Sequence, residues 1–274
     1  MPALTNFYEG SSVKMLLLGH SGSGKTGALA SLALAGYKLR IMDFDRGVES
    51  LFHQLSDKSS DSAEIKAKKK LARENTLYET FTDQIKIEGK FVLTKGIPTA
   101  WTKAMNCLNK WPGDPLGGLN QWGSDHVLVV DSLTFAGECI MRLVLALNGR
   151  SAALRQQSDW GDAMNMQEGL LAALYDDSVK ANVIVLSHIT SAKEEGALTE
   201  KGFPSALGSK LPPKVGRYFN SILMVEQKAG IRKIVTQPRG LIDLKTPASD
   251  FVPAELPIET GLATYFSILK GDKK

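Results

Sequence analysis

The feature that most constrains the fold is the octapeptide GHSGSGKT at Gly19 to Thr26. An apolar run, Met15 to Leu18, precedes it, and a run of small apolar residues that ends at Gly36 follows it. The octapeptide matches the pattern GxxxxGK(S/T) at every fixed position. Glycines in this pattern let successive backbone N–H groups turn inward around phosphate oxygens, and the following helix points the positive end of its dipole at the same place. The segment therefore predicts a strand, a phosphate-binding loop and a helix.

Two side chains of this loop have distinct expected roles. Lys25 can reach the β- and γ-phosphates of a nucleotide, and the Thr26 hydroxyl can complete the ligand shell of a Mg²⁺ ion. The choice between adenine and guanine stays open, since no clear guanine-specific NKxD sequence is found. The residues expected to contact the nucleotide are Gly19, His20, Ser21, Gly22, Ser23, Gly24, Lys25, Thr26 and Gly27.

Composition sets wide limits on the class of protein. An apolar content of 43% over 274 residues argues against disorder, and a net charge of +4 permits a polyanionic partner without requiring one. Cys107 and Cys139 have no metal-ligand spacing and cannot form a disulfide framework, which favours a reducing compartment. The sequence contains neither a signal-peptide core nor an apolar run of roughly twenty residues. We therefore expect a soluble, cytoplasmic protein without a membrane segment.

Two further apolar runs end in acidic residues. Leu39 to Met42 predicts a buried strand followed by Asp43 and Asp45, and His126 to Asp131 (HVLVVD) has the form of a Walker B strand. Ligands of parallel α/β sheets bind at the carboxyl ends of the strands. We expect the second strand to lie beside the phosphate-loop strand, so that Asp131 holds Mg²⁺ through its water shell. Its alternative role is to cap the helix that starts at Leu133.

A catalytic site for hydrolysis also needs a group that positions the attacking water. Asp45 is the first candidate and Glu49 the second, while Asp43 is more typical of a residue that faces the sheet or caps a turn. His188 directly follows another buried strand, Asn182 to Ser187. It can act as a sensor of the γ-phosphate or serve as a structural residue.

The remaining pattern predicts an α/β fold with a mainly parallel central sheet flanked by helices and with late antiparallel strands. We interpret residues 1–274 as one domain, with 50–97 as a helical and loop insertion and 248–274 as a C-terminal tail. Long loops are expected over 148–162 and 189–218. Further helices are expected at 63–73, 98–111, 133–147 and 164–175, and late strands at 221–226, 232–236 and 241–244.

The order GHSGSGKT, IMDFD, VLVVDSLT and VIVLSHIT resembles the RecA-like class of phosphate-loop ATPases. Together with SDWGD at Ser158 to Asp162 and KTP at Lys245 to Pro247, it looks like the RecA-like ATPases encoded by bacteriophages, which include single-strand annealing and recombination proteins. The similarity spans about residues 13–250. This chain has Asp in DFD where recombinases usually have Glu, and His188 where the bacterial recombinase has Gln. These differences concern strand exchange more than ATP binding.

The resemblance implies an ATPase that uses ATP and Mg²⁺ and assembles as a homo-oligomer, ring or filament, on single-stranded DNA. It also implies a positive residue supplied by the neighbouring subunit, for which Arg239 and Lys245 are the first choices and Arg232 and Lys233 the alternatives. A single-strand-binding or replication protein is a possible further partner. Loops after Asp131 and His188 would face the DNA, and their cations are Arg150, Arg155, Lys193, Lys201, Lys210, Lys214 and Arg217.

A different class of function is compatible with the same residues. In a nucleotide-switched binding module, ATP orders the 189–218 segment for a protein partner and hydrolysis is incidental. The small basic excess and the acids Glu194, Glu195 and Glu200 within that segment favour this hypothesis. A small-molecule kinase is a third, weaker hypothesis.

Overall fold

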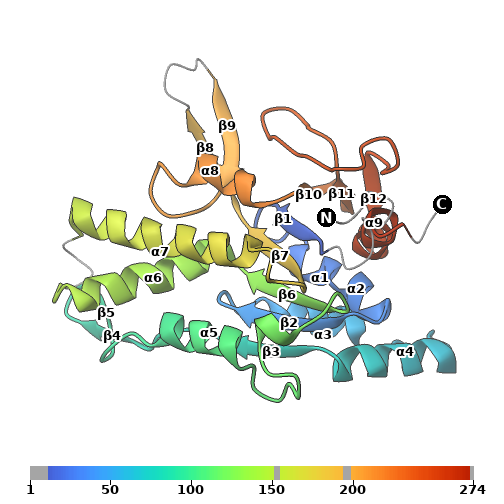
Figure 1. Cartoon of the computed structure of the whole chain (residues 1–274), viewed down its shortest axis with the longest axis horizontal. Helices are drawn as coiled ribbons and strands as arrows, with labels where there is room; N and C mark the ends of the chain where they lie inside the picture. Colours follow the sequence, from blue (N-terminus) through green and yellow to red (C-terminus); the bar gives the residue numbers. More distant parts are fainter. Residues whose placement is uncertain (1–11, 151–154, 194–198, 272–274) are drawn as a thin grey trace.

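The centre of the molecule is a sheet with the strand order β12-β11-β10-β1-β7-β6-β2-β3 (Figure 1). This computed structural model describes residues 12–150, 155–193 and 199–271. The six strands from β10 to β3 run parallel, and β11 and β12 are antiparallel to their neighbours. The predicted fold class is therefore confirmed. The strands are β1 (Lys14–Leu18), β2 (Lys38–Asp43), β3 (Leu77–Thr80), β6 (His126–Asp131), β7 (Asn182–Ser187), β10 (Ser221–Lys228), β11 (Ile231–Val235) and β12 (Glu255–Pro257).

Side chains alternate along each strand, so each central strand contributes to the apolar cores on both faces of the sheet. In β1, Leu16 and Leu18 belong to one apolar core, while Met15 and Leu17 belong to the core on the opposite face. A strand that is buried on both sides reads as a continuous apolar run rather than as an alternating one. Continuous apolar runs therefore identify β1, β6 and β7 in the sequence.

Helices form a layer on each face of the sheet (Figure 1). Among the described residues, no helix combines the length and the apolar content that crossing a lipid bilayer requires. The layer that contains Leu16 and Leu18 has α5 (Ala100–Asn109), α6 (Leu133–Leu147) and α7 (Gln157–Tyr175). The other layer has α1 (Lys25–Ala28), α2 (Ala30–Leu34), α3 (Val48–Leu55), α4 (Ala63–Glu74) and α9 (Gly261–Leu269).

The prediction of a loop over 148–162 is wrong in its second half, because α7 already begins at Gln157. The buried face of this helix includes Asp159 and Gln167 along with apolar residues. Asp159 accepts hydrogen bonds from the Gln156 N–H (2.7 Å) and from Asn148 Nδ2 (2.7 Å). A polar residue that is buried with satisfied hydrogen bonds interrupts the apolar periodicity, so the pattern hides the first two turns of the helix.

The segment 189–218 is also not the long loop that the sequence predicts. It contains a hairpin of β8 (Ile189–Lys193) and β9 (Glu200–Pro204), then α8 (Pro212–Val215) and a 3₁₀ turn (Gly216–Tyr218). The hairpin projects from the sheet (Figure 1), and most of its described residues are half-buried or exposed. A hairpin without a fully covered face lacks the apolar alternation that identifies a strand.

Two late elements differ from the prediction. Within residues 241–244, Ile242 forms isolated bridges and no strand is present, and the third late strand is β12 instead. The region 248–274, interpreted as a tail, contains β12 and α9, and Tyr265 and Phe266 of α9 are fully buried. Within 50–97, β3 joins the main sheet, while β4 (Ile85–Glu88) and β5 (Phe91–Thr94) form a separate hairpin.

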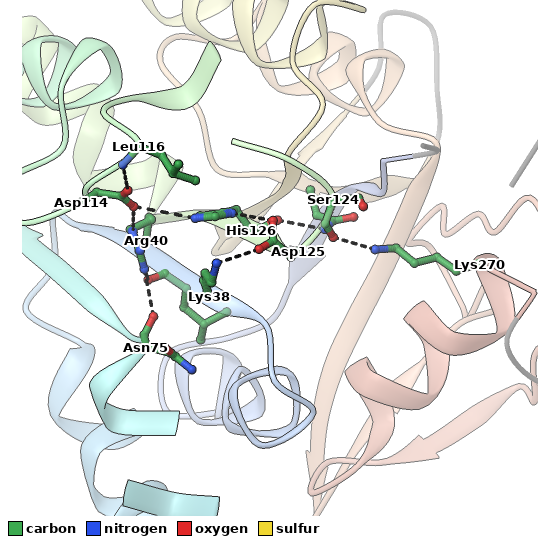
Figure 2. A network of polar contacts seen from close by, with 11 residues as sticks. Lys38, Arg40, Asn75, Asp114, Leu116, Ser124, Asp125, His126 and Lys270 are labelled. Carbon is green, nitrogen blue, oxygen red and sulfur yellow. Dashed lines mark hydrogen bonds and ion pairs between the residues drawn. The ribbon is translucent and has the colours of Figure 1, made fainter. Parts of the chain in front are cut away.

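A buried ion pair fixes the connection between α5 and β6 at the amino-terminal edge of the sheet (Figure 2). Arg40 Nε donates to Asp114 Oδ2 at 2.5 Å, and Arg40 Nη1 donates to the Asn75 carbonyl at 2.9 Å. The Asp114 Oδ1 atom accepts from the Leu116 N–H at 2.8 Å. The side chains of Arg40 and Asp114 are 6% and 1% exposed. Each charge therefore depends on the other for compensation in the protein interior.

The same network continues through His126, whose Nε2 atom lies 3.8 Å from Asp114 Oδ2 (Figure 2). The Asp125 carboxylate contacts His126 Nδ1 at 2.7 Å and Lys38 Nζ at 2.9 Å. Lys270, just after α9, donates to the Ser124 carbonyl at 2.9 Å. These contacts join the start of β2, the start of β6 and the end of α9.

Replacing Asp114 with Ala should destabilise the fold by about 3–5 kcal/mol, because it leaves the Arg40 charge buried without a partner. Denaturant unfolding followed by circular dichroism measures this difference. Lys68→Gln is the matched control, since it breaks an ion pair with Glu64 whose side chains are 63% and 78% exposed. It should change the free energy of unfolding little, because solvent screens an exposed ion pair. Equal effects of the two substitutions would contradict the importance of the buried pair.

Candidate nucleotide-binding site

The chain leaves β1 at Leu18 and forms a tight loop before α1. Gly22 and Gly24 have φ angles of 75° and 101°, in the left-handed region that favours glycine. A Cβ atom on Gly19 would lie 2.6 Å from Ser23 Oγ and 2.9 Å from the Val225 carbonyl oxygen. These glycines therefore have the conformational and steric roles that the sequence pattern predicts for them.

The strand that ends in Asp131 does not neighbour the phosphate-loop strand, which corrects the expected arrangement. β7 lies between β1 and β6. The Gly19 N–H donates to the Ser187 carbonyl at the end of β7 (3.2 Å). Thr26 Oγ1 nevertheless donates to Asp131 Oδ2 at 2.6 Å. The loop and the start of α1 thus bridge the end of β7 and reach β6.

Lys25 is buried within the loop. Its ammonium group donates to the carbonyl oxygens of Gly19 (2.9 Å) and His20 (3.1 Å). Burial lowers the pKa of Lys25, while the charges of Asp131 and Asp45 act in the opposite direction. The loop therefore encloses a positive group that faces two carboxylates across the site.

Asp131 is 1% exposed and lies among other acids. Burial is the largest effect and raises the pKa of Asp131. The charge of Asp45 raises this pKa further, and the hydrogen bond from Thr26 lowers it. Asp43 lies opposite Asp131 in the β2–β6 register and adds a smaller repulsion. Carboxylates gathered beside a hydroxyl are oxygen ligands of the kind that Mg²⁺ prefers. A divalent cation at this place would remove the repulsion among the acids.

Several polar atoms around the loop lack a partner within the described part of the chain. Ser23 Oγ, Asp45 Oδ1 and Ser132 Oγ are buried and form no hydrogen bond. Buried polar groups without partners are uncommon in folded proteins, and such groups often belong to binding sites. The residues present therefore fit a Mg²⁺–nucleotide complex, with Thr26 and Asp131 as the groups that would hold the metal.

The structure separates the three acids at the end of β2 and just after it. Asp43 Oδ1 accepts from the Gly47 N–H at 3.0 Å, so Asp43 caps the turn as expected. Asp45 is half-buried, and its charge acts on Lys25 and Asp131. The Glu49 side chain is 81% exposed and lies 3.4 Å from His53 Nε2. Asp45 is thus near the site, whereas Glu49 faces solvent.

His188 lies at the tip of β7, between the site and the β8–β9 hairpin. Its Nδ1 atom is 3.3 Å from Thr134 Oγ1, and its carbonyl accepts from the Ser205 N–H at 2.8 Å. Thr134 Oγ1 also donates to the Ser205 carbonyl at 3.3 Å. Burial lowers the pKa of His188, and the charge of Lys25 lowers it further. These contacts are compatible with both the structural and the sensor role.

Gly47 is a site residue that the sequence analysis does not identify. A Cβ atom there would lie 2.8 Å from Asp45 Oδ1, 3.2 Å from Thr26 Oγ1 and 3.3 Å from Asp131 Oδ2. The signal in the sequence is weak, because it consists of a glycine two residues after the acids of DFD. The backbone of Gly47 therefore approaches the expected metal ligands more closely than any larger residue could.

The candidates for a cation supplied by a neighbouring subunit lie in different surroundings. Arg239 donates to Glu226 (2.8 Å) and Glu255 (2.5 Å), and Lys233 contacts the same two acids. Lys245 is exposed on a segment that bridges to β10. Arg232 Nη2 instead lies 3.4 Å from the carbonyl oxygen of Gly22, in the phosphate loop of its own chain.

The cations predicted to face DNA fall into two separated groups. Arg150 and Arg155 lie where α6 ends and α7 begins, at one end of the molecule, whereas the others lie on or near the projecting β8–β9 hairpin (Figure 1). Several are paired with acids, and Lys193, Lys210 and Lys214 are exposed. The ion pairs are Arg150 with Asp159, Arg155 with Glu138 (3.8 Å), Lys201 with Asp243 (3.8 Å) and Arg217 with Glu168.

A glycine-rich loop after β1, a lysine enclosed by it and an acid bonded to its threonine define a P-loop domain. The sequence model of the AAA domain family matches residues 11–247, and the chain therefore belongs to this family of P-loop ATPase domains. No curated protein matches the chain. Among solved structures, the chain is similar to the crystal structure of the RadB recombinase, with 17% identity and a TM-score of 0.47 over 83% of this chain and 81% of that one.

Replacing Gly47 with Ala should weaken Mg²⁺-dependent nucleotide binding by about tenfold or more, because the added methyl group would displace side chains expected to hold the metal, and disturbing the groups that orient metal ligands typically costs about 10–100-fold in metal affinity. Titration calorimetry with ATP in the presence and absence of Mg²⁺ measures the effect. Gly169→Ala is the control, since Gly169 is exposed in α7 and a Cβ atom there meets no atom within 4 Å. Unchanged affinity in the Gly47 variant would show that this close approach has no functional role.

Proposed function

We propose that this protein is an ATPase of the phage recombination or replication type, which hydrolyses ATP with Mg²⁺ and couples hydrolysis to binding or annealing of single-stranded DNA. We further propose that it consists of one RecA-like domain and acts as a homo-oligomer. The observation that carries the catalytic part is the 2.6 Å contact between Thr26 and Asp131. It brings a P-loop hydroxyl and a Walker B acid together across 105 residues of sequence.

Each residue of the site has a role in this proposal. The N–H groups of the loop and Lys25 bind the phosphates, and Thr26 and Asp131 hold the metal directly or through its water shell. The bound metal would neutralise charge that develops on the phosphate oxygens. Asp45 orients the attacking water and accepts its proton, because its Oδ1 atom is buried without another partner. His188 responds to the γ-phosphate.

The coupling to DNA is supported by the connection between His188 and the β8–β9 hairpin. The His188 carbonyl and Thr134 Oγ1 both bond to Ser205, the residue directly after β9. A change at the phosphates can therefore reach the base of the hairpin through one residue. The exposed Lys210 and Lys214 follow the hairpin and are available for DNA phosphates.

The second candidate function is a nucleotide-switched module that binds a protein. The observation that favours it is the pairing of Arg150, Arg155, Lys201 and Arg217 with acids. A paired cation must lose its partner before it can bind a phosphate of DNA, which reduces the electrostatic gain. In this alternative the hairpin binds a protein when ATP is present, and DNA has little effect on hydrolysis.

Lys25→Ala should abolish ATP hydrolysis, and Asp45→Asn should lower kcat by about a hundredfold or more, because it removes the base that orients water. A phosphate-release assay at saturating ATP measures both. Glu49→Gln is the comparison for Asp45, since Glu49 faces solvent and should keep nearly full activity. The reverse result, with Glu49 essential and Asp45 dispensable, would assign the water-positioning role to Glu49.

Single-stranded DNA should raise ATP turnover, and the effect should fall steeply with salt, because binding to phosphates releases counterions. The double variant Lys210→Gln and Lys214→Gln should weaken DNA binding in fluorescence anisotropy and should leave turnover without DNA unchanged. Lys66→Gln and Lys70→Gln on the exposed face of α4 provide a control with the same change in charge. If the rate of ATP turnover by an active protein does not change when DNA is added, the protein-binding module is favoured.

A further inference from the structure

Arg232 lies on the rim of the phosphate loop of its own chain. It is the second residue of β11, and its Nη2 atom is 3.4 Å from the Gly22 carbonyl oxygen. A Cβ atom on Gly24 would lie 3.1 Å from Arg232 Cδ, so the arginine stem rests directly on the loop backbone. A distance of 3.4 Å exceeds the usual N–H···O separation of about 2.9–3.0 Å. The guanidinium group is therefore held weakly and keeps donors for a stronger acceptor.

Arg232 differs from Lys233 and Arg239, which lie near it, because they form ion pairs with acids. Lys233 and Arg239 are both neutralised by Glu226 and Glu255. Among the described residues, no carboxylate forms an ion pair with Arg232. Arg232 is exposed and lies beside the phosphate-binding loop, so it can bind an anion there without breaking an existing ion pair.

The side chain of Arg232 also borders a cleft that opens beside the loop. The cleft has a volume of about 1070 Å³, and Gly24, Gly27, Gln54, Arg232 and Ile258 are among the residues that line it. Gly27 follows the lysine and threonine of the loop, where the helix begins. A nucleotide whose terminal phosphates occupy the loop must place its remaining part in adjoining space, and this cleft adjoins the loop on the side of Arg232.

We propose that Arg232 is a nucleotide-binding residue that acts in cis. Its guanidinium group donates hydrogen bonds to phosphate oxygens of the nucleoside triphosphate held by the loop of the same chain, and it leaves the Gly22 carbonyl when it does so. This inference rests on the proposed nucleotide site. It distinguishes Arg232 from a cation that reaches the site of a neighbouring subunit.

The test measures binding of fluorescent N-methylanthraniloyl ATP with Mg²⁺ to the full chain. Arg232→Gln should weaken binding by about tenfold or more, because a hydrogen bond to a charged group is lost. Arg232→Lys should give an intermediate affinity, since it keeps the charge but loses the planar donor fork. Lys228→Gln is the matched control, as it removes one charge from an exposed position of the same hairpin and should bind as the unaltered protein does.

A mixing experiment separates action in cis from action in trans. Excess Lys25→Ala protein, which has an intact Arg232 but a disabled loop, is added to the Arg232→Gln variant. Weak binding that persists in the mixture supports the cis role, whereas recovery of the normal affinity shows that a neighbour supplies the arginine and overturns it. Normal affinity of Arg232→Gln alone also overturns it. Absence of binding by the unaltered protein would instead refute the nucleotide site, and the role of Arg232 with it.

Discussion

The contact between Thr26 and Asp131 is the interaction on which the site depends. It joins the helix that follows the phosphate loop to the end of β6, although β7 separates the two strands in the sheet. The phosphate loop starts at the end of β7, where the Gly19 N–H donates to the Ser187 carbonyl. Burial and the charge of Asp45 raise the pKa of Asp131, and a divalent cation at this place would offset both effects. The residues gathered here therefore fit a Mg²⁺–nucleotide complex.

The amino-terminal ends of the strands, opposite the site, are organised in a different way. There Arg40 and Asp114 satisfy each other's charge, and the neighbouring carbonyl and N–H groups complete their hydrogen bonds. These paired charges fix the connection before β6. At one end of the strands, charged residues that pair with each other stabilise the fold. At the other end, buried polar atoms without partners fit a binding site.

Two hairpins lie close to the phosphate loop. On one side, His188 and Thr134 connect the end of β7 to Ser205 at the base of the projecting hairpin. On the other side, Arg232 of the β10–β11 hairpin rests on the loop and borders the adjoining cleft. The β8–β9 hairpin is mostly half-buried or exposed, and the tip of the β10–β11 hairpin is exposed over residues 227–232, whereas the central strands are covered on both faces.

The sequence by itself determined the phosphate loop, the buried strands and the fold class, because glycine conformations and burial on both faces leave local patterns. The bounds of β6 (His126–Asp131) follow directly from its apolar run. Only the tertiary structure decided that β7 separates β1 from β6, that Asp45 rather than Glu49 lies near the site, and that Arg232 rests on the loop of its own chain. It also revealed the hairpin and the first turns of α7, where polar or uncovered residues remove the apolar periodicity. Strand order and contacts such as that between Arg232 and Gly22, 210 residues apart, result from packing of the whole chain, and no local pattern encodes them.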